Sequence, residues 1–335
     1  MKKLFYINHI VLFLIILLIL FCFTGCKKTD DNIKYPQGIF PDTIINMSNI
    51  NSAFDDYNTT LYQLNGYLPI IFSSNRKSAG FQFDLEQGFI SFTFDQTNAN
   101  FELETTMTND EFLNSIINKA QTSGNDFGPY QLFSSLDGQE YTLVSSENGE
   151  GKLDLFYLRY APYYGTYLPE IYGPNPVKLL NTNFDDAYFC FDLNQDSAYF
   201  SSNPEGNFDI FLKRRPSETD IASWFDLDYS VPVKVDSINS PSDDMCPIVY
   251  HNVMVFTSNR PGGLDGYDLY YSIFRNGNWS SPVNFGPDIN TSSNEYRPLI
   301  GYHPDFLNTF MIFSSDRPGG KGKFDLYFSG FELPE

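Results

Sequence analysis

One short phrase recurs five times along this chain of 335 residues. Its two clearest copies are residues 256–270, FTSNRPGGLDGYDLY, and residues 313–327, FSSDRPGGKGKFDLY. Weaker copies begin at residues 72, 144 and 200. A unit repeated in this way cannot bury its own apolar face, so the five copies are expected to pack on one another.

The spacing of the copies is regular after the first. Successive steps are 72, 56, 56 and 57 residues between Ser74, Ser146, Ser202, Ser258 and Ser315. A second phrase, in which an Asn-Ser or Asn-Thr pair is followed by two acidic or amide residues, precedes each copy at 50–56, 180–186, 238–244 and 289–295, with a degenerate form at 121–126. Two phrases in a constant order indicate five equivalent structural units.

Each unit has the pattern of four short strands separated by turns rich in Asn, Asp, Gly and Pro. The sequence therefore predicts an all-β fold, a five-bladed β-propeller of four-stranded antiparallel blades. The blades are expected at about 51–120, 121–180, 181–238, 239–289 and 290–331 within a domain of residues 39–335. The exception to the strand pattern is a helix predicted over 110–121, where apolar residues recur at helical spacing.

The ends of the chain predict how the ring closes. The last unit stops soon after its third strand, and residues 40–46 stand just before the first acidic phrase, where a fourth strand belongs. We expect this segment to complete the last blade, which would remove an exposed sheet edge. A solenoid is the alternative, but it requires polar capping units, and the sequence contains none.

The two phrases resemble the TolB-type β-propeller repeat, an Asp-rich relative of WD repeats. The resemblance covers roughly residues 40 to 331 and is strongest in the fourth and fifth units. In the first three units the Pro-Gly-Gly loop is degraded, so those loops are expected to be built differently. The resemblance implies a platform for protein docking.

The N-terminus has the pattern of a bacterial lipoprotein. Two lysines, an apolar run over residues 10–23 and a small-residue site indicate a signal peptide, residues 1–25. The Phe-Thr-Gly-Cys ending resembles a lipobox, which implies that Cys26 is lipidated and that 26–38 form a tether; an ordinary signal peptide is the alternative. Residues 27–31, KKTDD, resemble an export signal of surface lipoproteins. A plain solvated tether is the alternative interpretation of these five residues. We expect an outer-membrane lipoprotein of a Gram-negative bacterium, on the periplasmic or the surface face.

The composition excludes one class of partner. The formal net charge is −20 at pH 7, so the surface repels nucleic acid and anionic lipid headgroups. Membrane attachment is therefore expected only through the lipid. Of the four cysteines, Cys190 and Cys246 remain in the propeller, and we expect two free buried thiols rather than a disulfide.

Two sets of acidic residues recur with the repeat. The first set begins each third strand. Its carboxylates are predicted to accept hydrogen bonds from backbone N–H groups and from the serines of the phrase, and so to hold the adjoining loop. Arg76, Arg260 and Arg317 are predicted to brace the same loops.

The second set precedes each innermost strand. It is predicted to form an acidic ring at one mouth of the channel, with loop capping as the alternative. Such a ring suits calcium or a cationic group of a partner. The first set is Asp84, Asp154, Asp209, Asp268 and Asp325; the second is Asp55, Asp56, Asp126, Asp185, Asp186, Asp243, Asp244 and Glu295.

Aromatic residues form a third candidate site. Tyrosine and tryptophan present flat apolar faces with a polar tip, which suit protein partners or sugar rings. A hydrophobic cover on the blade edge is the alternative. The candidates are Tyr160, Tyr163, Tyr164, Tyr167, Trp224 and Trp279.

The functional prediction is a binding or scaffold module, without enzymatic activity or cofactor, that recruits a protein or glycan at the envelope as a monomer or as a subunit of an envelope complex. Only His251 and His303 remain after signal removal, which disfavours a Ser-His-Asp triad and a multi-histidine zinc site. The alternative is a glycoside-active enzyme with paired carboxylates at the propeller axis. Clustering of the non-repeat acids Glu140, Asp192 and Glu170 at one mouth of the channel would favour that alternative.

Overall fold

The computed structural model describes residues 33–61 and 68–334. The predicted signal peptide, Cys26 and the tether up to residue 32 lie outside these ranges. Residues 37–94 and 101–334 belong to one compact unit, and residues 33–36 and 95–100 belong to a second, small one. Within the described ranges, no helix is both long enough and apolar enough to cross a membrane.

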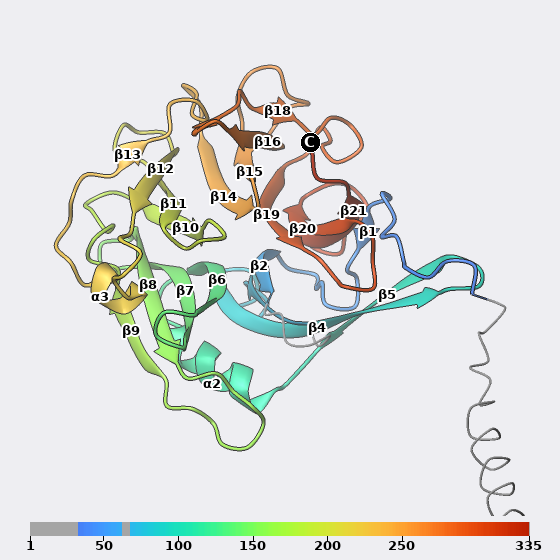
Figure 1. The fold of residues 1–335 in the computed structure, drawn as a ribbon, viewed down its shortest axis with the longest axis horizontal. Helices are drawn as coiled ribbons and strands as arrows, with labels where there is room; N and C mark the ends of the chain where they lie inside the picture. Colours follow the sequence, from blue (N-terminus) through green and yellow to red (C-terminus); the bar gives the residue numbers. More distant parts are fainter. Residues whose placement is uncertain (1–32, 62–67, 335) are drawn as a thin grey trace, which may run out of the picture. The chain divides into compact units, whose positions relative to one another are not determined.

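The larger unit is a five-bladed β-propeller of antiparallel sheets, as predicted (Figure 1). The innermost strand of each blade is β2, β6, β10, β14 or β19, and the chain then runs outward. The blades are β2 (Asp56–Leu61), β3 (Leu68–Ser74), β4 (Asp84–Asp95) and β5 (Asn100–Met107); β6 (Asp126–Ser134), β7 (Gln139–Glu147), β8 (Leu153–Tyr160) and β9 (Tyr172–Pro176); β10 (Asp186–Phe191), β11 (Ser197–Ser202), β12 (Asp209–Arg214) and β13 (Val233–Lys234); β14 (Asp244–Tyr250), β15 (Val253–Ser258) and β16 (Asp268–Arg275), with β17 (Asn278–Trp279) and β18 (Val283–Asn284) both paired to β16; and β19 (Glu295–Gly301), β20 (Thr309–Ser315), β21 (Asp325–Phe331) and β1 (Ile45–Asn46).

The two ends of the propeller sequence close the ring in the fifth blade, as expected. β1 pairs antiparallel with β21, with Ile45 opposite Phe328. Just before β1, Phe40 is 1% exposed, and its ring stacks on that of Phe306 at a centroid distance of 3.9 Å. The aromatic contacts fix the closing segment, because β1 itself has only two residues.

A bulge with an unusual backbone conformation recurs on all five innermost strands. The residue at the bulge has a positive φ in every blade, and in four of them its N–H donates to a serine or threonine hydroxyl on the second strand of the preceding blade. This bond joins neighbouring blades close to the axis and explains why the repeated phrase carries two hydroxyl residues in succession. The bulge residues are Asn58, Gly128, Tyr188, Cys246 and Arg297.

The loop after the second strand is built alike in the fourth and fifth blades. Gly262 and Gly319 adopt φ values of 96° and 95°, a region that glycine enters without a steric penalty. Gly80 has a φ of 98° in the first blade, but it stands six residues after Ser74, whereas Gly262 and Gly319 stand four residues after Ser258 and Ser315. The first loop therefore turns at a different point, as expected from its lack of the Pro-Gly-Gly sequence.

Within the described residues, two helices interrupt the strand pattern. The predicted helix is α2 (Glu111–Ala120), whose N-cap Asp110 accepts a hydrogen bond from the N–H of Leu113 at 2.9 Å. The second, α3 (Ile221–Phe225), is short and was not predicted. It lies between β12 and β13 in the sequence, and its buried Trp224 and Phe225 pack on β10 of the third blade, Phe225 also on Tyr157 of β8. The helix therefore covers parts of both the second and the third blades.

The closing contacts predict a strong effect of one substitution. Phe40→Ala removes a buried ring that holds the last blade to the N-terminal segment, and we expect the free energy of unfolding to fall by about 3–5 kcal/mol. Chemical denaturation followed by fluorescence measures this loss. Phe81→Ala is the control, because that side chain is 87% exposed. Equal effects of the two substitutions would show that the closing segment does not stabilise the ring.

Candidate functional site

The first member of each acidic pair joins one blade to the preceding one. Asp55 accepts a hydrogen bond from the N–H of Phe324 at 2.9 Å, which links the first blade to the fifth. Asp185 and Asp243 accept from the N–H groups of Leu153 and Phe208 at 3.0 and 2.9 Å. Asn125 and Asn294 do the same in the remaining blades through their side-chain oxygens. We refer to these five contacts as the blade staples.

The second member of each pair is fully buried beneath its own loop. Ser74 donates to Asp56 at 2.7 Å, Ser146 donates to Asp126 at 2.6 Å, and Ser315 donates to Glu295 at 2.9 Å. Burial raises the pKa of Asp126 and of Glu295, and the hydroxyl and backbone donors oppose that shift. Asp186 and Asp244 occupy the same place in the third and fourth blades.

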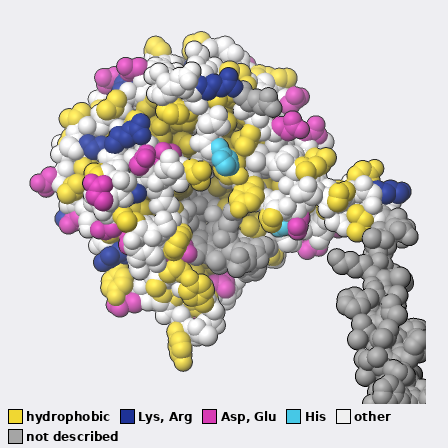
Figure 2. Space-filling view, in the orientation of Figure 1, with side chains coloured by type: hydrophobic (Ala, Val, Ile, Leu, Met, Phe, Trp, Pro, Cys, Tyr) yellow, Lys and Arg dark blue, Asp and Glu magenta, His cyan; other side chains and the backbone are white. Residues whose placement is uncertain are grey.

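The structure does not bring these acids to the channel as a ring. That end of the axis is closed by aromatic side chains; Tyr57, for example, lies 5.4 Å from Tyr296 and 6.2 Å from Phe127 between ring centroids. On the face that Figure 2 shows, acidic side chains are dispersed rather than gathered in one patch. Within the described part of the chain, no group of three or more His, Cys, Asp or Glu side chains is arranged to hold a metal ion.

The acids that begin the third strands bind their own loops. Asp268 accepts hydrogen bonds from the N–H of Leu264 at 2.7 Å, and Asp325 accepts from the N–H of Lys321 at 2.7 Å. Asp209 pairs instead with Lys234, while Asp84 and Asp154 accept from Gln82 and Asn148. The serines of the phrase were expected to donate to this set; where their bonds are resolved, they donate to the second members of the acidic pairs.

The aromatic candidates do not form one surface. Tyr160, Trp224 and Trp279 are buried, and Tyr163 stacks on Phe112 of α2 with centroids 4.6 Å apart. Tyr164 and Tyr167 are 86% and 89% exposed on the loop between β8 and β9. The candidate set therefore combines core residues with two solvated side chains.

The two propeller cysteines are free and buried, as predicted. They lie near Arg297, whose side chain occupies the interior of the ring at 2% exposure. Arg297 Nη2 lies 3.4 Å from the carbonyl oxygens of Gly128 and Pro129, whereas its Nε and Nη1 donate to no described residue. Burial raises the pKa of the Cys190 thiol to about 12, and the Arg297 charge opposes this shift.

A cavity opens at the other end of the axis, where the innermost strands finish. It has a volume of about 390 Å³, and all five blades contribute to its wall. Glu140 at the start of β7 is 5% exposed and is the one carboxylate among the described wall residues. We call this space the axial cavity; its wall is Leu61, Tyr130, Gln131, Leu132, Phe133, Glu140, Leu193, Tyr250, Leu299, Ile300 and Tyr302.

The three non-repeat acids fall in different places. Glu140 lines the axial cavity, and Asp192 immediately precedes the wall residue Leu193. Asp192 caps the turn after β10 by accepting hydrogen bonds from the N–H groups of Asp196 and Ser197. Glu170 lies in a separate groove over the second and third blades, where it accepts from the Tyr172 hydroxyl at 2.7 Å. Glu140 is the one member of this set among the described residues of the axial wall, whereas Asp192 lines a separate small cavity with Tyr199 and Trp279, so the expected cluster is not formed.

Comparison with solved structures identifies other proteins with this fold. The endo-arabinase from Bacteroides thetaiotaomicron aligns with a TM-score of 0.51 at 10% identity, over 89% of this chain and 98% of that one. The GH43_1 enzyme from Xanthomonas citri aligns with a TM-score of 0.52 at 9% identity, over 86% and 90%. The exo-β-1,3-galactanase 1,3Gal43A from Clostridium thermocellum aligns with a TM-score of 0.51 at 12% identity, over 87% and 63%. No family model matches the sequence, and no curated protein matches it either.

These matches correct three predictions. The resemblance to TolB-type propellers is contradicted, because the similar solved structures are five-bladed glycoside hydrolases. The repeated Asp residues form blade staples and the Pro-Gly-Gly residues form loop turns. Both serve the propeller architecture, so they do not identify one family. The scaffold prediction and the prediction of no enzymatic activity are contradicted by the same comparison. At 9–12% identity the likeness itself shows the fold.

The staples predict which acids stabilise the ring. Asp243→Ala removes the acceptor of the Phe208 N–H and of the Tyr267 hydroxyl, at 2.9 and 2.7 Å. We expect unfolding to become easier by about 1–3 kcal/mol, since both donors lose their partner. Differential scanning calorimetry checks this, with the exposed Asp236→Ala as control. An unchanged melting temperature for Asp243→Ala would contradict the staple.

Proposed function

We propose that this protein is a glycoside-active enzyme whose saccharide site is the axial cavity. One observation carries the proposal: the ends of all five innermost strands surround a single cavity at the axis, with Glu140 buried in its wall. A site built from several elements of a rigid ring holds a substrate in a defined orientation. The likeness of the fold to glycoside hydrolases supports this assignment.

The wall combines the two kinds of group that bind sugars. Tyr130, Tyr250 and Tyr302 supply aromatic surface, against which the apolar face of a sugar ring can pack. Gln131 Oε1 is buried and accepts no hydrogen bond from the described residues, so it is an acceptor for a sugar hydroxyl. The amide and the aromatic faces together suit a neutral saccharide.

Glycoside hydrolysis commonly uses two carboxyl groups, one to protonate the leaving-group oxygen and one to act as base or nucleophile. We assign the first role to Glu140, because it lies within the wall. We assign the second role to Asp192, which follows β10. Burial is the main cause of the raised pKa of the wall residue Tyr130, and the charge of Asp192 contributes to the same shift. Burial also raises the pKa of Asp192 itself.

The solved structures suggest the first substrates to test. Two of the similar proteins are described as an endo-arabinase and an exo-β-1,3-galactanase. Arabinan, β-1,3-galactan and the matching chromogenic glycosides therefore form the initial panel.

The activity assay distinguishes this proposal through three substitutions. Glu140→Gln and Asp192→Asn are each expected to lower kcat by about 10²- to 10⁴-fold, the range for loss of an acid–base group. Glu170→Gln is the matched control, because that acid belongs to another groove, and it should retain activity. Release of reducing sugar, or of the chromophore, gives the rate.

Two outcomes would contradict the assignment. One is that the folded wild-type protein hydrolyses none of the panel. The other is that Glu140→Gln keeps full activity while its circular dichroism spectrum and melting temperature match those of the wild type.

We also propose that the enzyme is a lipoprotein anchored through Cys26, on the outer membrane. Metabolic labelling with a palmitate analogue is expected to label the wild-type chain and Cys190→Ser, but not Cys26→Ser. Cys190 serves as the control because it is a buried free thiol of the propeller. Label on the Cys26→Ser chain would overturn the anchor.

A further inference from the structure

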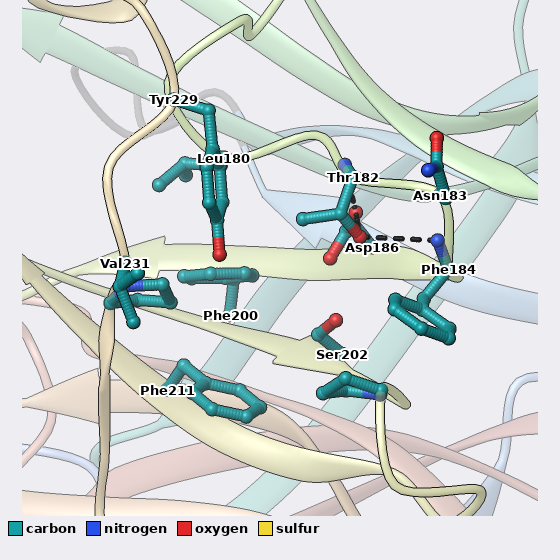
Figure 3. A pocket seen from close by; sticks show the side chains of 12 residues that line it. Leu180, Thr182, Asn183, Phe184, Asp186, Phe200, Ser202, Phe211, Tyr229 and Val231 are labelled. Carbon is teal, nitrogen blue, oxygen red and sulfur yellow. Dashed lines mark hydrogen bonds between the residues drawn. The ribbon is translucent and has the colours of Figure 1, made fainter.

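A second cavity lies in the third blade, at the opposite end of the ring from the axial cavity. Its volume is about 480 Å³, and Asp186, at the start of β10, lies in its wall together with Ser202 at the end of β11 (Figure 3). Phe200 and Phe211 form an aromatic side of the same space, and Tyr229 and Val231 lie across from them.

In the first, fourth and fifth blades an arginine side chain fills the corresponding place. Arg260 pairs with Asp244, the counterpart of Asp186, and donates to the carbonyl oxygen of Ile238 at 2.7 Å. Its guanidinium carbon lies 5.1 Å from the ring centroid of Phe256 and 5.0 Å from that of Tyr270. The guanidinium is therefore held by a carboxylate, a carbonyl and two aromatic rings.

The same arrangement recurs in the other two blades. Arg317 pairs with Glu295 at 3.0 Å and lies 5.1 and 5.0 Å from Phe313 and Tyr327. Arg76 pairs with Asp56 and lies 5.3 Å from Phe72. Three blades thus hold an arginine against a carboxylate. Two rings flank it in the fourth and fifth blades, and one ring does in the first, where Glu86 stands opposite Phe72.

The third blade has proline at this position. Pro204 follows Asn203 as Arg260 follows Asn259 and as Arg76 follows Asn75. Proline has no guanidinium and no backbone N–H. In the fourth blade that N–H, of Arg260, donates to the Ser258 hydroxyl at 3.2 Å. The third blade therefore retains the surroundings of the arginine without its side chain.

The aromatic pair keeps the spacing that holds a guanidinium elsewhere. The rings of Phe200 and Phe211 are 6.0 Å apart at an interplanar angle of 32°. The corresponding pairs are 6.0 Å apart at 26° in the fourth blade and 6.1 Å apart at 23° in the fifth. The third-blade cavity is thus preformed and has not collapsed around the missing side chain.

Among the described residues, no cation forms an ion pair with the carboxylate of this cavity. Asp186 is fully buried, and its Oδ2 accepts from the N–H and hydroxyl of Thr182 at 2.6 and 2.8 Å. Its Oδ1 accepts no hydrogen bond within the described ranges, although the Ser202 hydroxyl lies close enough to lower its pKa. Burial, the main effect, raises the pKa of Asp186 to about 6, so the group is mostly ionised at pH 7.5.

Two further observations separate this cavity from its neighbours. In the second blade, which also lacks the arginine, both oxygens of Asp126 have partners, Thr122 and Ser146. Three lysines near the third-blade cavity are held by other groups: Lys152 lies against Phe184, Lys213 donates to the carbonyl oxygens of Ser230 and Val231, and Lys234 pairs with Asp209 and Glu205. None of these three contacts involves Asp186.

We propose that the third-blade cavity binds the guanidinium group of a ligand, in the arrangement that the protein uses for its own arginines in the fourth and fifth blades. The carboxylate of Asp186 pairs with the guanidinium, and Phe200 and Phe211 flank it. The source is a free small guanidine or an arginine side chain of a peptide. The proposal is independent of the saccharide site.

The test uses the full chain purified in detergent at pH 7.5, titrated with N-acetyl-arginine amide by calorimetry. N-acetyl-citrulline amide, the neutral isostere, is the control ligand, and an acetylated Gly-Arg-Gly amide tests the peptide source. The wild type is expected to bind the arginine amide at least about tenfold more tightly than the citrulline amide. Pro204→Arg, which supplies the cation within the chain, and Asp186→Asn should each abolish this preference.

A reciprocal variant gives a readout that does not depend on the third blade. Arg260→Ala empties the arrangement of the fourth blade, and the arginine amide should raise the melting temperature of this variant more than that of the wild type. Tighter binding of the tripeptide than of the amino-acid amide assigns the site to a peptide, and the reverse order assigns it to a small guanidine. Equal binding of the arginine and citrulline amides to the wild type would overturn the proposal, as would an arginine preference retained in a folded Asp186→Asn variant.

Discussion

The blade staple is the contact on which the ring depends. A side-chain oxygen at the start of one blade accepts the backbone N–H of the preceding blade, and in four of the five places a backbone bond lies beside it, as between the Asp56 N–H and the Phe324 carbonyl. Each staple fixes two blades that share no sheet hydrogen bonds. Because only an acceptor oxygen is needed, aspartate and asparagine alternate freely at this position, as Asp55 and Asn125 show.

The staples and the bulges divide the ring into two functionally different ends. At the stapled end, aromatic rings close the axis and the acids are used within loops. The Arg297 side chain fills the next level inward. Only at the far end, where the innermost strands finish, does the axis open into a cavity with a buried carboxylate. The repeat acids lie at the other end of each innermost strand, so their position in the sequence of each blade keeps them out of this cavity.

Departures from the repeat are more informative than the repeat itself. Five copies of one unit must satisfy the same packing and hydrogen-bonding requirements, so a residue common to all of them serves the architecture. Pro204 breaks the pattern where the surrounding acid, serine and rings persist, and a cavity results. Glu140 and Gln131 belong to neither phrase, and they line the other cavity. The prediction of an acidic ring rested on the repeated acids, whereas the residues that line the cavities stand at single positions.

The sequence by itself determined the five-bladed ring, its closure by the N-terminal segment, helix α2 and the free thiols, because period, turn chemistry and apolar spacing are local properties of the chain. It did not determine which way a given carboxylate points. Asp55 and Asp56 are adjacent, yet one reaches the preceding blade and the other turns under its own loop. Tertiary structure decided that, and it also decided that strand ends from five blades meet at one cavity, because both depend on contacts between residues far apart in the sequence.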